Sequence, residues 1–241
     1  MVRTKFRFAI EFLLILLVLC LIAAAFSFSA IFFGTPSSPV QNQPHKKAFT
    51  VVLDAGHGGE DGGAVGASGL YEKDLNLRVA SLVRELLEAN GVTVVMTRET
   101  DTLLYDRNVD YHGRKKALDH AERLRIGQTT ENSIFVSIHM NAYPQTQYHG
   151  LQVWYSPNDP HSAEIAETIQ STVREHLQPE NTRRTKAATS SIYLLHHLNT
   201  PAVLIECGFL SNPEEAASLS DDEYQRKLAF LIFLAIMEAG G

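Results

Sequence analysis

The sequence predicts an α/β fold, a single domain with a mainly parallel twisted sheet flanked by helices and preceded by one N-terminal transmembrane helix. Short β-branched segments alternate with amphipathic helical segments from residue 49 onward, which is the pattern of an α/β fold. The composition is ordinary for a globular protein, with 45% hydrophobic and 20% charged residues. A chain of 241 residues is long enough for one sizeable core, and the sequence contains no internal repeat.

Five strands and two amphipathic helices make up most of the predicted domain. The first helix, residues 72–90, and the second, residues 159–177, each place apolar side chains on one face. Gly91 ends the first helix. The predicted strands are the short apolar or β-branched segments 49–53, 92–97, 133–138, 151–155 and 202–205.

A last helix and one charged insertion complete the domain. Ser220 and Glu223 form a capping box that predicts the start of the last helix. The apolar run 228–237 in this helix is too short to cross a membrane, so we expect it to pack against the sheet. Residues 98–132 are rich in charges and weakly periodic, which indicates an insertion with one helix over residues 106–127.

The N-terminal segment, residues 1–33, is predicted to anchor the protein in a membrane. Three basic residues within the first seven precede an uncharged apolar run, residues 12–33, that is long enough to span a bilayer. Because basic flanking residues stay in the cytoplasm, the domain should lie on the extracytoplasmic side. The alternative is a secreted protein, cleaved near residues 23–25. Residues 34–48 are rich in Pro, Ser and Gln and are expected to be a linker.

Charge and cysteine content exclude some classes of protein. Residues 49–241 contain 16 Lys and Arg against 26 Asp and Glu, so this domain is strongly acidic at neutral pH. Such a domain does not bind nucleic acid by neutralising phosphates. Cys20 lies in the N-terminal apolar run and Cys207 in the domain, so no disulfide within the domain is possible.

Three predicted strands lead into residues that could bind a metal. The first strand is followed by His57, the third by His139 and the fifth by Glu206. Because ligands bind at the carboxyl ends of the strands in open α/β sheets, these residues should converge on one edge. Glu72 opens the first helix and should project at the same edge. Two imidazoles and a carboxylate suit Zn²⁺, whose catalytic sites keep three protein ligands and one open position for water.

The residue pattern alone leaves open which glutamate binds the metal. If His57, His139 and Glu72 are the ligands, Glu206 is free to act as the general base. Glu206 would then deprotonate a zinc-bound water for attack on a carbonyl and pass the proton to the leaving amine.

Two other interpretations of these residues are weighed against the zinc site. The glycine-rich loop 56–66 could cradle a phosphate, although it lacks the Gly-Lys-Ser/Thr sequence of a phosphate loop. Cys207 could be a thiol nucleophile with His139 as its base. A small buried residue is the simpler interpretation of Cys207.

Candidate substrate contacts are less specific. Asn141 follows His139 by two residues and should lie at the same edge of the sheet. Arg183, Arg184 and Lys186 form a basic cluster in an acidic domain. Arg183 and Arg184 could hold a substrate carboxylate, whereas a solvated loop is the alternative interpretation.

Four motifs of the chain occur together: DAGHGG at 54–59, EKDLNL at 72–77, SIHMNA at 137–142 and IECGFLSNP at 205–213. In this order they resemble the type-3 family of zinc N-acetylmuramoyl-L-alanine amidases. The resemblance covers residues 49–241, and the family usually has Pro where this chain has Ala55 and an aliphatic residue where it has Cys207.

The resemblance implies one zinc ion per chain, bound by His57, Glu72 and His139, with Glu206 as the catalytic carboxylate. It also implies hydrolysis of the amide bond between the lactyl group of N-acetylmuramic acid and the first L-alanine of peptidoglycan. The expected substrate is therefore a glycan strand with its stem peptide.

A finer resemblance is to the germination-specific amidases of spore-forming bacteria. It is carried by the N-terminal segment, residues 96–102, the charged insertion and residues 191–195. This resemblance implies a role in making muramic δ-lactam in the spore cortex, together with a deacetylase, and an accessory protein is a further expected partner.

Some relatives block their own active site with a helix in the insertion. Because residues 107–122 have few apolar side chains, deletion of residues 106–128 is predicted to give no large gain in activity.

Two rival functions are consistent with the same motifs. A zinc peptidase or deacetylase could act on another bond of the wall, and product analysis would distinguish it. A wall-binding protein with an inactive site is the second rival. Against it, all four metal and catalytic residues are present in this sequence.

Overall fold

A six-stranded sheet lies at the centre of the folded part of the chain. The computed structural model describes residues 17–18, 49–66, 69–106, 108 and 112–240. The strands lie in the order β2-β1-β3-β6-β4-β5. Neighbouring strands are parallel except β4 and β6, which are antiparallel, so the prediction of a mainly parallel sheet is confirmed. The strands are β1 (Thr50–Ala55), β2 (Thr93–Met96), β3 (Ser133–Asn141), β4 (Gln152–Tyr155), β5 (Lys186–Ala187) and β6 (Ala202–Phe209).

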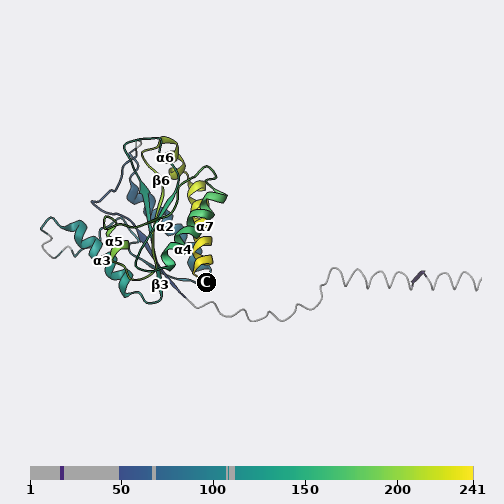
Figure 1. The fold of residues 1–241 in the computed structure, drawn as a ribbon, viewed down its shortest axis with the longest axis horizontal. Coiled ribbons are helices and arrows are strands. Elements are labelled where there is room, and N and C mark those ends of the chain that lie inside the picture. The colour runs from purple at the N-terminus through teal and green to yellow at the C-terminus, as the bar shows by residue number, and fades with distance from the viewer. Residues whose placement is uncertain (1–16, 19–48, 67–68, 107, 109–111, 241) are drawn as a thin grey trace, which may run out of the picture. The chain divides into compact units, whose positions relative to one another are not determined.

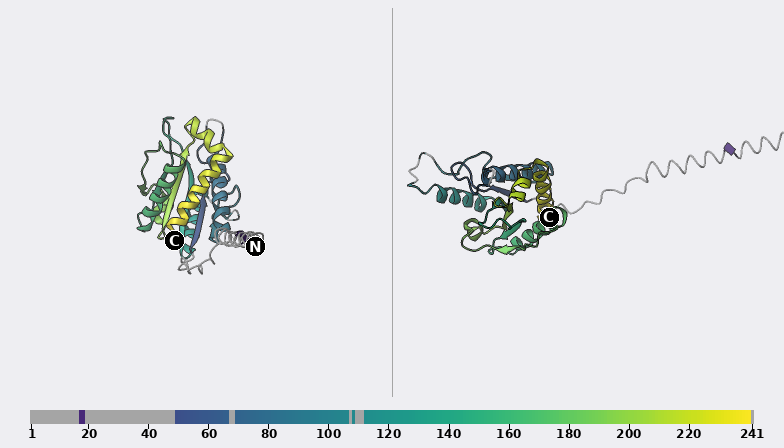
Figure 2. Two further views of the ribbon diagram at one scale, coloured as in Figure 1. Left: turned by 90° about the vertical axis from the view of Figure 1, so that its right-hand side faces the viewer. Right: turned by 90° about the horizontal axis from the view of Figure 1, so that it is seen from above.

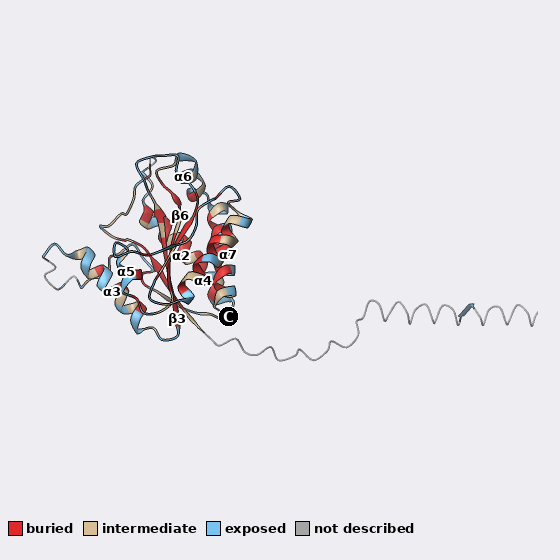
Figure 3. Ribbon diagram, in the orientation of Figure 1, coloured by how far each residue is buried: buried red, intermediate tan, exposed pale blue. Residues whose placement is uncertain are grey.

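Helices cover both faces of this sheet (Figure 1; Figure 2). The first face carries the larger core, in which apolar residues of β1, β3 and β6 pack under α2, α4 and α7. The second face carries a smaller core under α3 and α5. Figure 3 shows buried residues concentrated in the strands and on the inner sides of α2, α4 and α7. The helices are α2 (Glu72–Ala89), α3 (Lys115–Thr129), α4 (His161–His176), α5 (Tyr193–His197), α6 (Pro213–Ser220) and α7 (Asp222–Ala239).

The central strands β3 and β6 are longer than predicted. β3 continues to Asn141 and β6 to Phe209, so His139 and Glu206 lie within strands rather than after them. Each of these strands has a neighbour on both sides, and the backbone pairing holds their polar ends in the sheet. The site residues are therefore fixed by the sheet itself and not by a loop.

Two helix starts were predicted wrongly. The helix of the insertion is α3, which begins at Lys115 rather than at residue 106 and ends two residues later than predicted. The last helix is capped by Asp221, whose side chain accepts a hydrogen bond from the Tyr224 N–H, while Ser220 is the last residue of α6. The capping box of Ser220 and Glu223 is therefore wrong by one residue. The short elements β5, α5 and α6 were not predicted.

The chain divides into two compact units, Met1–Lys46 and Lys47–Gly241. In the first unit only Leu17 and Val18 are described, and both are helical. The rest of the predicted anchor, residues 1–33, and the linker, residues 34–48, lie outside the described residues. Among the residues that the structure describes, none of the helices combines the length and the apolar content needed to span a membrane.

Candidate active site

The register of the sheet places His139 and Glu206 side by side. His139 of β3 is paired with Glu206 of β6, and Glu206 is paired in turn with Gln152 of β4. Directly paired residues of neighbouring strands project from the same face of a sheet. His139, Glu206 and Gln152 therefore form one row across the second face, near the carboxyl ends of β3 and β6.

Glu72 reaches this row from the first turn of α2. The residue is only 4% exposed, yet both carboxylate oxygens have hydrogen-bond partners. Oε2 accepts a hydrogen bond from the Ala64 N–H at 2.8 Å, and Oε1 accepts one from the Met140 N–H at 3.2 Å. Oε1 also lies 2.9 Å from Nδ1 of His139. These contacts fix the carboxylate between the glycine-rich loop and β3.

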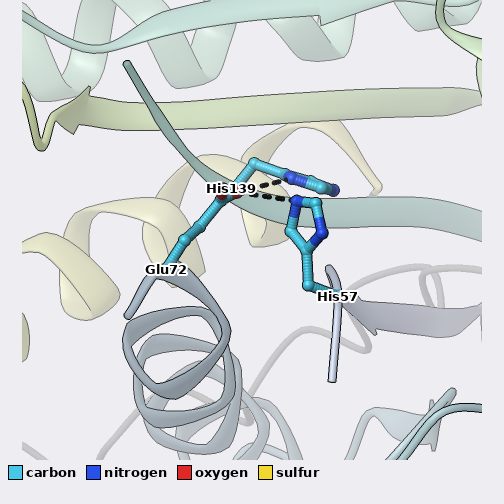
Figure 4. Close-up of side chains that lie close together, drawn as sticks. All are labelled: His57, Glu72 and His139. Carbon is cyan, nitrogen blue, oxygen red and sulfur yellow. Dashed lines mark hydrogen bonds and ion pairs between the residues drawn. The ribbon is translucent and has the colours of Figure 1, made fainter. Parts of the chain in front are cut away.

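His57 completes the group from a strained backbone position after β1. Its φ angle is 61°, in the left-handed region that residues other than glycine rarely adopt. Nε2 of its ring lies 3.2 Å from Oε1 of Glu72, and Nδ1 lies 2.9 Å from Oδ2 of Asp61. Figure 4 shows both imidazoles directed toward the Glu72 carboxylate. A carboxylate on the far nitrogen of an imidazole is a common support for a metal-binding histidine.

These three side chains could hold one metal ion. One ligand atom from each of His57, Glu72 and His139 lies within 4.8 Å of the others. Two imidazole nitrogens and one carboxylate are a donor set that fits Zn²⁺. The structure therefore brings together the three residues that the sequence suggested as ligands.

Two glycines leave the space that this group occupies. A Cβ atom on Gly56 would collide with the imidazole of His139. A Cβ atom on Gly63, whose φ is 66°, would collide with the Glu72 carboxylate and the His57 ring. The glycine-rich loop thus serves to admit these side chains, and its contacts give no support to a phosphate-binding role.

The electrostatics of the three candidate ligands are strongly coupled. Burial alone would raise the pKa of Glu72, but the hydrogen bonds and charges of His139 and His57 hold it far below its usual value. Burial alone would lower the pKa of His57, but Glu72 and Asp61 outweigh it and raise this pKa to about 9. In the absence of metal the raised pKa of His57 favours a proton on its imidazole, and a bound cation would compete with that proton.

Glu206 differs from Glu72 in that one of its carboxylate oxygens has no hydrogen-bond partner within the described part of the chain. Its Oε2 atom is buried and has no hydrogen-bond partner among the described residues. Burial raises the pKa of Glu206 to about 7; His139 opposes this shift, and the charge of Glu72 adds to it. A carboxyl with a pKa near neutrality can both accept and return a proton, which a general base must do.

A buried ion network beneath the site was not predicted. Arg123 of α3 donates hydrogen bonds to Asp54 Oδ1 at 2.6 Å and to Asp119 Oδ2 at 2.7 Å. It also donates to the backbone carbonyls of Ala55 and His57, at 2.8 and 2.7 Å. Arg123 is 1% exposed, so these contacts are shielded from solvent. The helix of the insertion therefore supports the backbone that carries His57.

A second arginine, Arg98, also stabilises the backbone that precedes His57. Arg98 donates to the carbonyl oxygens of Ala55 at 2.8 Å and Gly56 at 3.0 Å, and to that of Lys73 at 2.7 Å. It thereby ties the end of β1 to the first turn of α2, which carries Glu72. The signal for both arginines in the sequence was only a charged, weakly periodic stretch.

The candidate substrate residues have different surroundings. Asn141 and Arg183 both line a hollow beside Glu206, together with aromatic residues. Arg184 is exposed, and among the described residues it contacts the neighbouring Gln152 only through its backbone carbonyl.

Cys207 is fully buried in the core of the first face, where burial raises the pKa of its thiol. That environment does not suit a thiolate nucleophile.

Two imidazoles and a carboxylate that could hold a metal, next to a separate half-buried carboxylate at one edge of an α/β sheet, are the arrangement expected of a metal-dependent hydrolase. Comparison with known sequences agrees with this class. The family model described as N-acetylmuramoyl-L-alanine amidase matches residues 51–238. The chain therefore belongs to this amidase family, as the four sequence motifs predicted.

Individual relatives narrow the resemblance. The chain is 41% identical over 187 residues to the germination-specific N-acetylmuramoyl-L-alanine amidase of Bacillus subtilis (strain 168). This match covers 78% of each protein. The structure of the CwlD amidase from Clostridioides difficile in complex with the GerS lipoprotein is similar, with a TM-score of 0.75 and 39% identity. That match covers 79% of this chain and 98% of the solved one. The AmiC2 amidase of Nostoc punctiforme matches at a TM-score of 0.67 and 30% identity, over 79% of this chain and 96% of AmiC2.

Proposed function

We propose that this chain is a zinc-dependent amidase that hydrolyses the bond between N-acetylmuramic acid and L-alanine in peptidoglycan. His57, Glu72 and His139 would hold the zinc ion, and Glu206 would be the catalytic residue. When bound, the ion would polarise the scissile carbonyl and lower the pKa of a water molecule beside it. The observation that carries the proposal is the buried Oε2 of Glu206, which has no hydrogen-bond partner in the described part of the chain and lies next to a group that could hold a metal.

The two glutamates have different roles in this proposal because their surroundings differ. Both oxygens of Glu72 are fixed by hydrogen bonds, which suits a ligand that must stay in place. Oε2 of Glu206 has no such partner among the described residues, so it is available to accept a proton from water. With a pKa near 7, Glu206 could then return this proton to the leaving nitrogen.

A digest of purified peptidoglycan with residues 47–241 tests the activity. Mass spectrometry should detect free stem peptides and peptide-free glycan, and a chelator should abolish both until zinc is restored. Cys207→Ser should keep this activity, because the thiol takes no part in the proposed chemistry. Cleavage within the peptide, or release of acetate without free stem peptides, would instead identify a peptidase or a deacetylase.

We also propose a role in the spore cortex, based on the similarity to the germination-specific amidase. The enzyme would supply peptide-free muramic acid, which a deacetylase then prepares for closure to muramic δ-lactam. Muropeptide analysis of spores that lack this protein should show loss of the lactam. A normal lactam content in those spores would exclude the role.

Two further proposals concern partners and location. The similar CwlD amidase was solved in complex with the GerS lipoprotein, which supports an accessory protein for this chain as well. Residues 1–33 would anchor the chain in the membrane, with the domain on the extracytoplasmic side where peptidoglycan lies. Secretion after cleavage of the N-terminal segment is the alternative location.

A further inference from the structure

The hollow beside Glu206 is built from three strands and two loops. Four aromatic rings and one cation line most of it, together with the amides of Asn141 and Gln152. Phe209 at the end of β6 and Trp154 of β4 contribute rings from the sheet, while Tyr143 and Tyr148 contribute rings from the loop between β3 and β4. Tyr143 and Tyr148 are 50% and 40% exposed. Aromatic side chains so exposed beside a candidate catalytic residue commonly bind a ligand.

Arg183 is the cation of this hollow. Its guanidinium lies 4.4 Å from the centre of the Phe209 ring, in stacking distance. Nε donates to the His149 carbonyl at 2.7 Å, and Nη1 donates to Oε1 of Gln152 at 3.0 Å. These contacts fix the plane of the guanidinium, and among the described residues Nη2 makes no hydrogen bond.

Arg183 also lacks a carboxylate partner, although the domain is acidic. Within the described part of the chain it forms no ion pair. The nearby Glu215 accepts hydrogen bonds from the backbone N–H groups of Gly150 and Phe209, at 2.8 Å each. A fixed arginine with an unused terminal nitrogen is suited to bind a carboxylate from a ligand.

The position of the hollow indicates which side of the substrate it would contact. In the row His139, Glu206, Gln152, the candidate metal ligand lies on one side of Glu206, and Gln152 lies on the other. The proton that Glu206 returns goes to the leaving nitrogen, so this nitrogen must lie near Glu206. If the candidate metal ligands hold the carbonyl group on the His139 side of Glu206, the peptide that leaves extends toward Gln152 and the hollow.

We propose that this hollow binds the leaving stem peptide and that Arg183 recognises a free carboxylate on the residue after L-alanine. The inference depends on the proposed amidase function, because it uses the direction of proton transfer by Glu206. The aromatic rings would cover the apolar part of that residue, and the guanidinium would select the charged form of the substrate over a neutral one.

Two matched substrates test this directly with the full-length protein in detergent, loaded with zinc. One is an N-acetylmuramoyl dipeptide whose second residue has a free carboxylate. The other has a carboxamide at that position and is otherwise identical. Because a charge-assisted hydrogen bond is worth more than a neutral one, we expect kcat/KM to be about 10- to 100-fold higher for the carboxylate.

Variants assign the preference to one residue. Arg183→Gln should remove the preference by lowering kcat/KM for the carboxylate substrate alone, and Arg183→Lys should retain part of it. Arg184→Gln should keep the preference, because this side chain lies outside the lining of the hollow. Arg226→Gln, which removes one exposed positive charge on α7, controls for net charge.

Each outcome either supports the inference or overturns it. Equal kcat/KM for the two substrates in the wild type overturns it, and so does an equal loss for both substrates in Arg183→Gln. Loss of the preference in Arg184→Gln also overturns it, because Arg184 and not Arg183 would then bind the carboxylate. If Arg183→Gln does not fold, the wild type and Arg183→Lys still decide. Hydrolysis of neither substrate by the wild type, with peptidoglycan also uncut, is failure of the proposed function instead.

Discussion

The Oε2 atom of Glu206 is buried and has no hydrogen-bond partner among the residues that the structure describes, and this lowers the stability of the fold when the carboxyl is ionised. The pKa of Glu206 is about 7 in the folded protein, against an ordinary value of 4.5, so the folded state holds this proton more tightly than the unfolded chain does. Because the unfolded chain ionises first as pH rises, the contribution of this group to stability is present below pH 4.5. It is lost progressively as pH rises to about 7.

Replacing this carboxyl should therefore stabilise the metal-free protein at high pH. We predict that Glu206→Gln raises the free energy of unfolding at pH 8 by up to about 3 kcal/mol, since each pKa unit corresponds to about 1.4 kcal/mol. The difference should vanish near pH 4.5, which serves as the internal control. Urea unfolding with a chelator present, at several pH values, measures it. A constant difference at all pH values would mean that the carboxyl is not the cause.

At the scale of single residues, the sequence selected three side chains that the fold brings together, those of His57, Glu72 and His139. His57, Glu72, His139 and Glu206 could be found because each lies at the end of a strand or the start of a helix, where side chains converge. The sequence could not separate Glu72 from Glu206, because their roles depend on hydrogen bonds that form only in the fold. Glu72 accepts hydrogen bonds from backbone N–H groups of two other segments, and Oε2 of Glu206 accepts none among the described residues.

At the scale of elements, α3 shows where sequence reasoning failed. Arg123 is a charged residue in a charged segment, and nothing local marks it as buried. Its burial depends on Asp54, which precedes it by 69 positions and lies at the end of β1. The start of α3 was misplaced for a related reason, because weak apolar periodicity gives no sharp boundary. The amphipathic helices, by contrast, were predicted from apolar periodicity and the larger strands from β-branched segments, although β3 and β6 are longer than predicted.

Arg123 should be essential to the stability of this part of the molecule. Arg123→Met would leave Asp54 and Asp119 without their cation, so we predict a loss of about 3–5 kcal/mol in the free energy of unfolding. Arg125→Met is the matched control, because Arg125 lies on the same helix but is 60% exposed and pairs only with Glu122 among the described residues. It should cost less than about 1 kcal/mol. Similar losses in both variants, measured by denaturant unfolding, would contradict a specific role for the buried network.

The same network bears on the insertion as a whole. Deletion of residues 106–128 was predicted to give no large gain in activity. Because α3 supplies Arg123 to the backbone of Ala55 and His57, the deletion should instead lower both stability and zinc affinity. A strong gain in activity with zinc retained would show that this segment blocks the site.

At the scale of the whole molecule, the compact unit Lys47–Gly241 contains all the candidate site residues. Under the proposed function, the N-terminal segment would determine only where the enzyme is located. We predict that the full-length protein fractionates with membranes, whereas residues 47–241 remain in the soluble fraction and cut isolated peptidoglycan at a similar rate. Recovery of a shortened protein in the medium would favour cleavage of the N-terminal segment over a permanent anchor.

The division of labour between the two glutamates is best tested by measuring zinc content and turnover together in Glu206→Gln and Glu72→Gln. Glu206→Gln should retain one zinc ion per chain and lose turnover by at least about 10²- to 10⁴-fold, the usual contribution of a general base. Glu72→Gln should lose the metal, because it removes one of three ligands. Loss of zinc in Glu206→Gln, with zinc retained in Glu72→Gln, would show that the two roles are reversed.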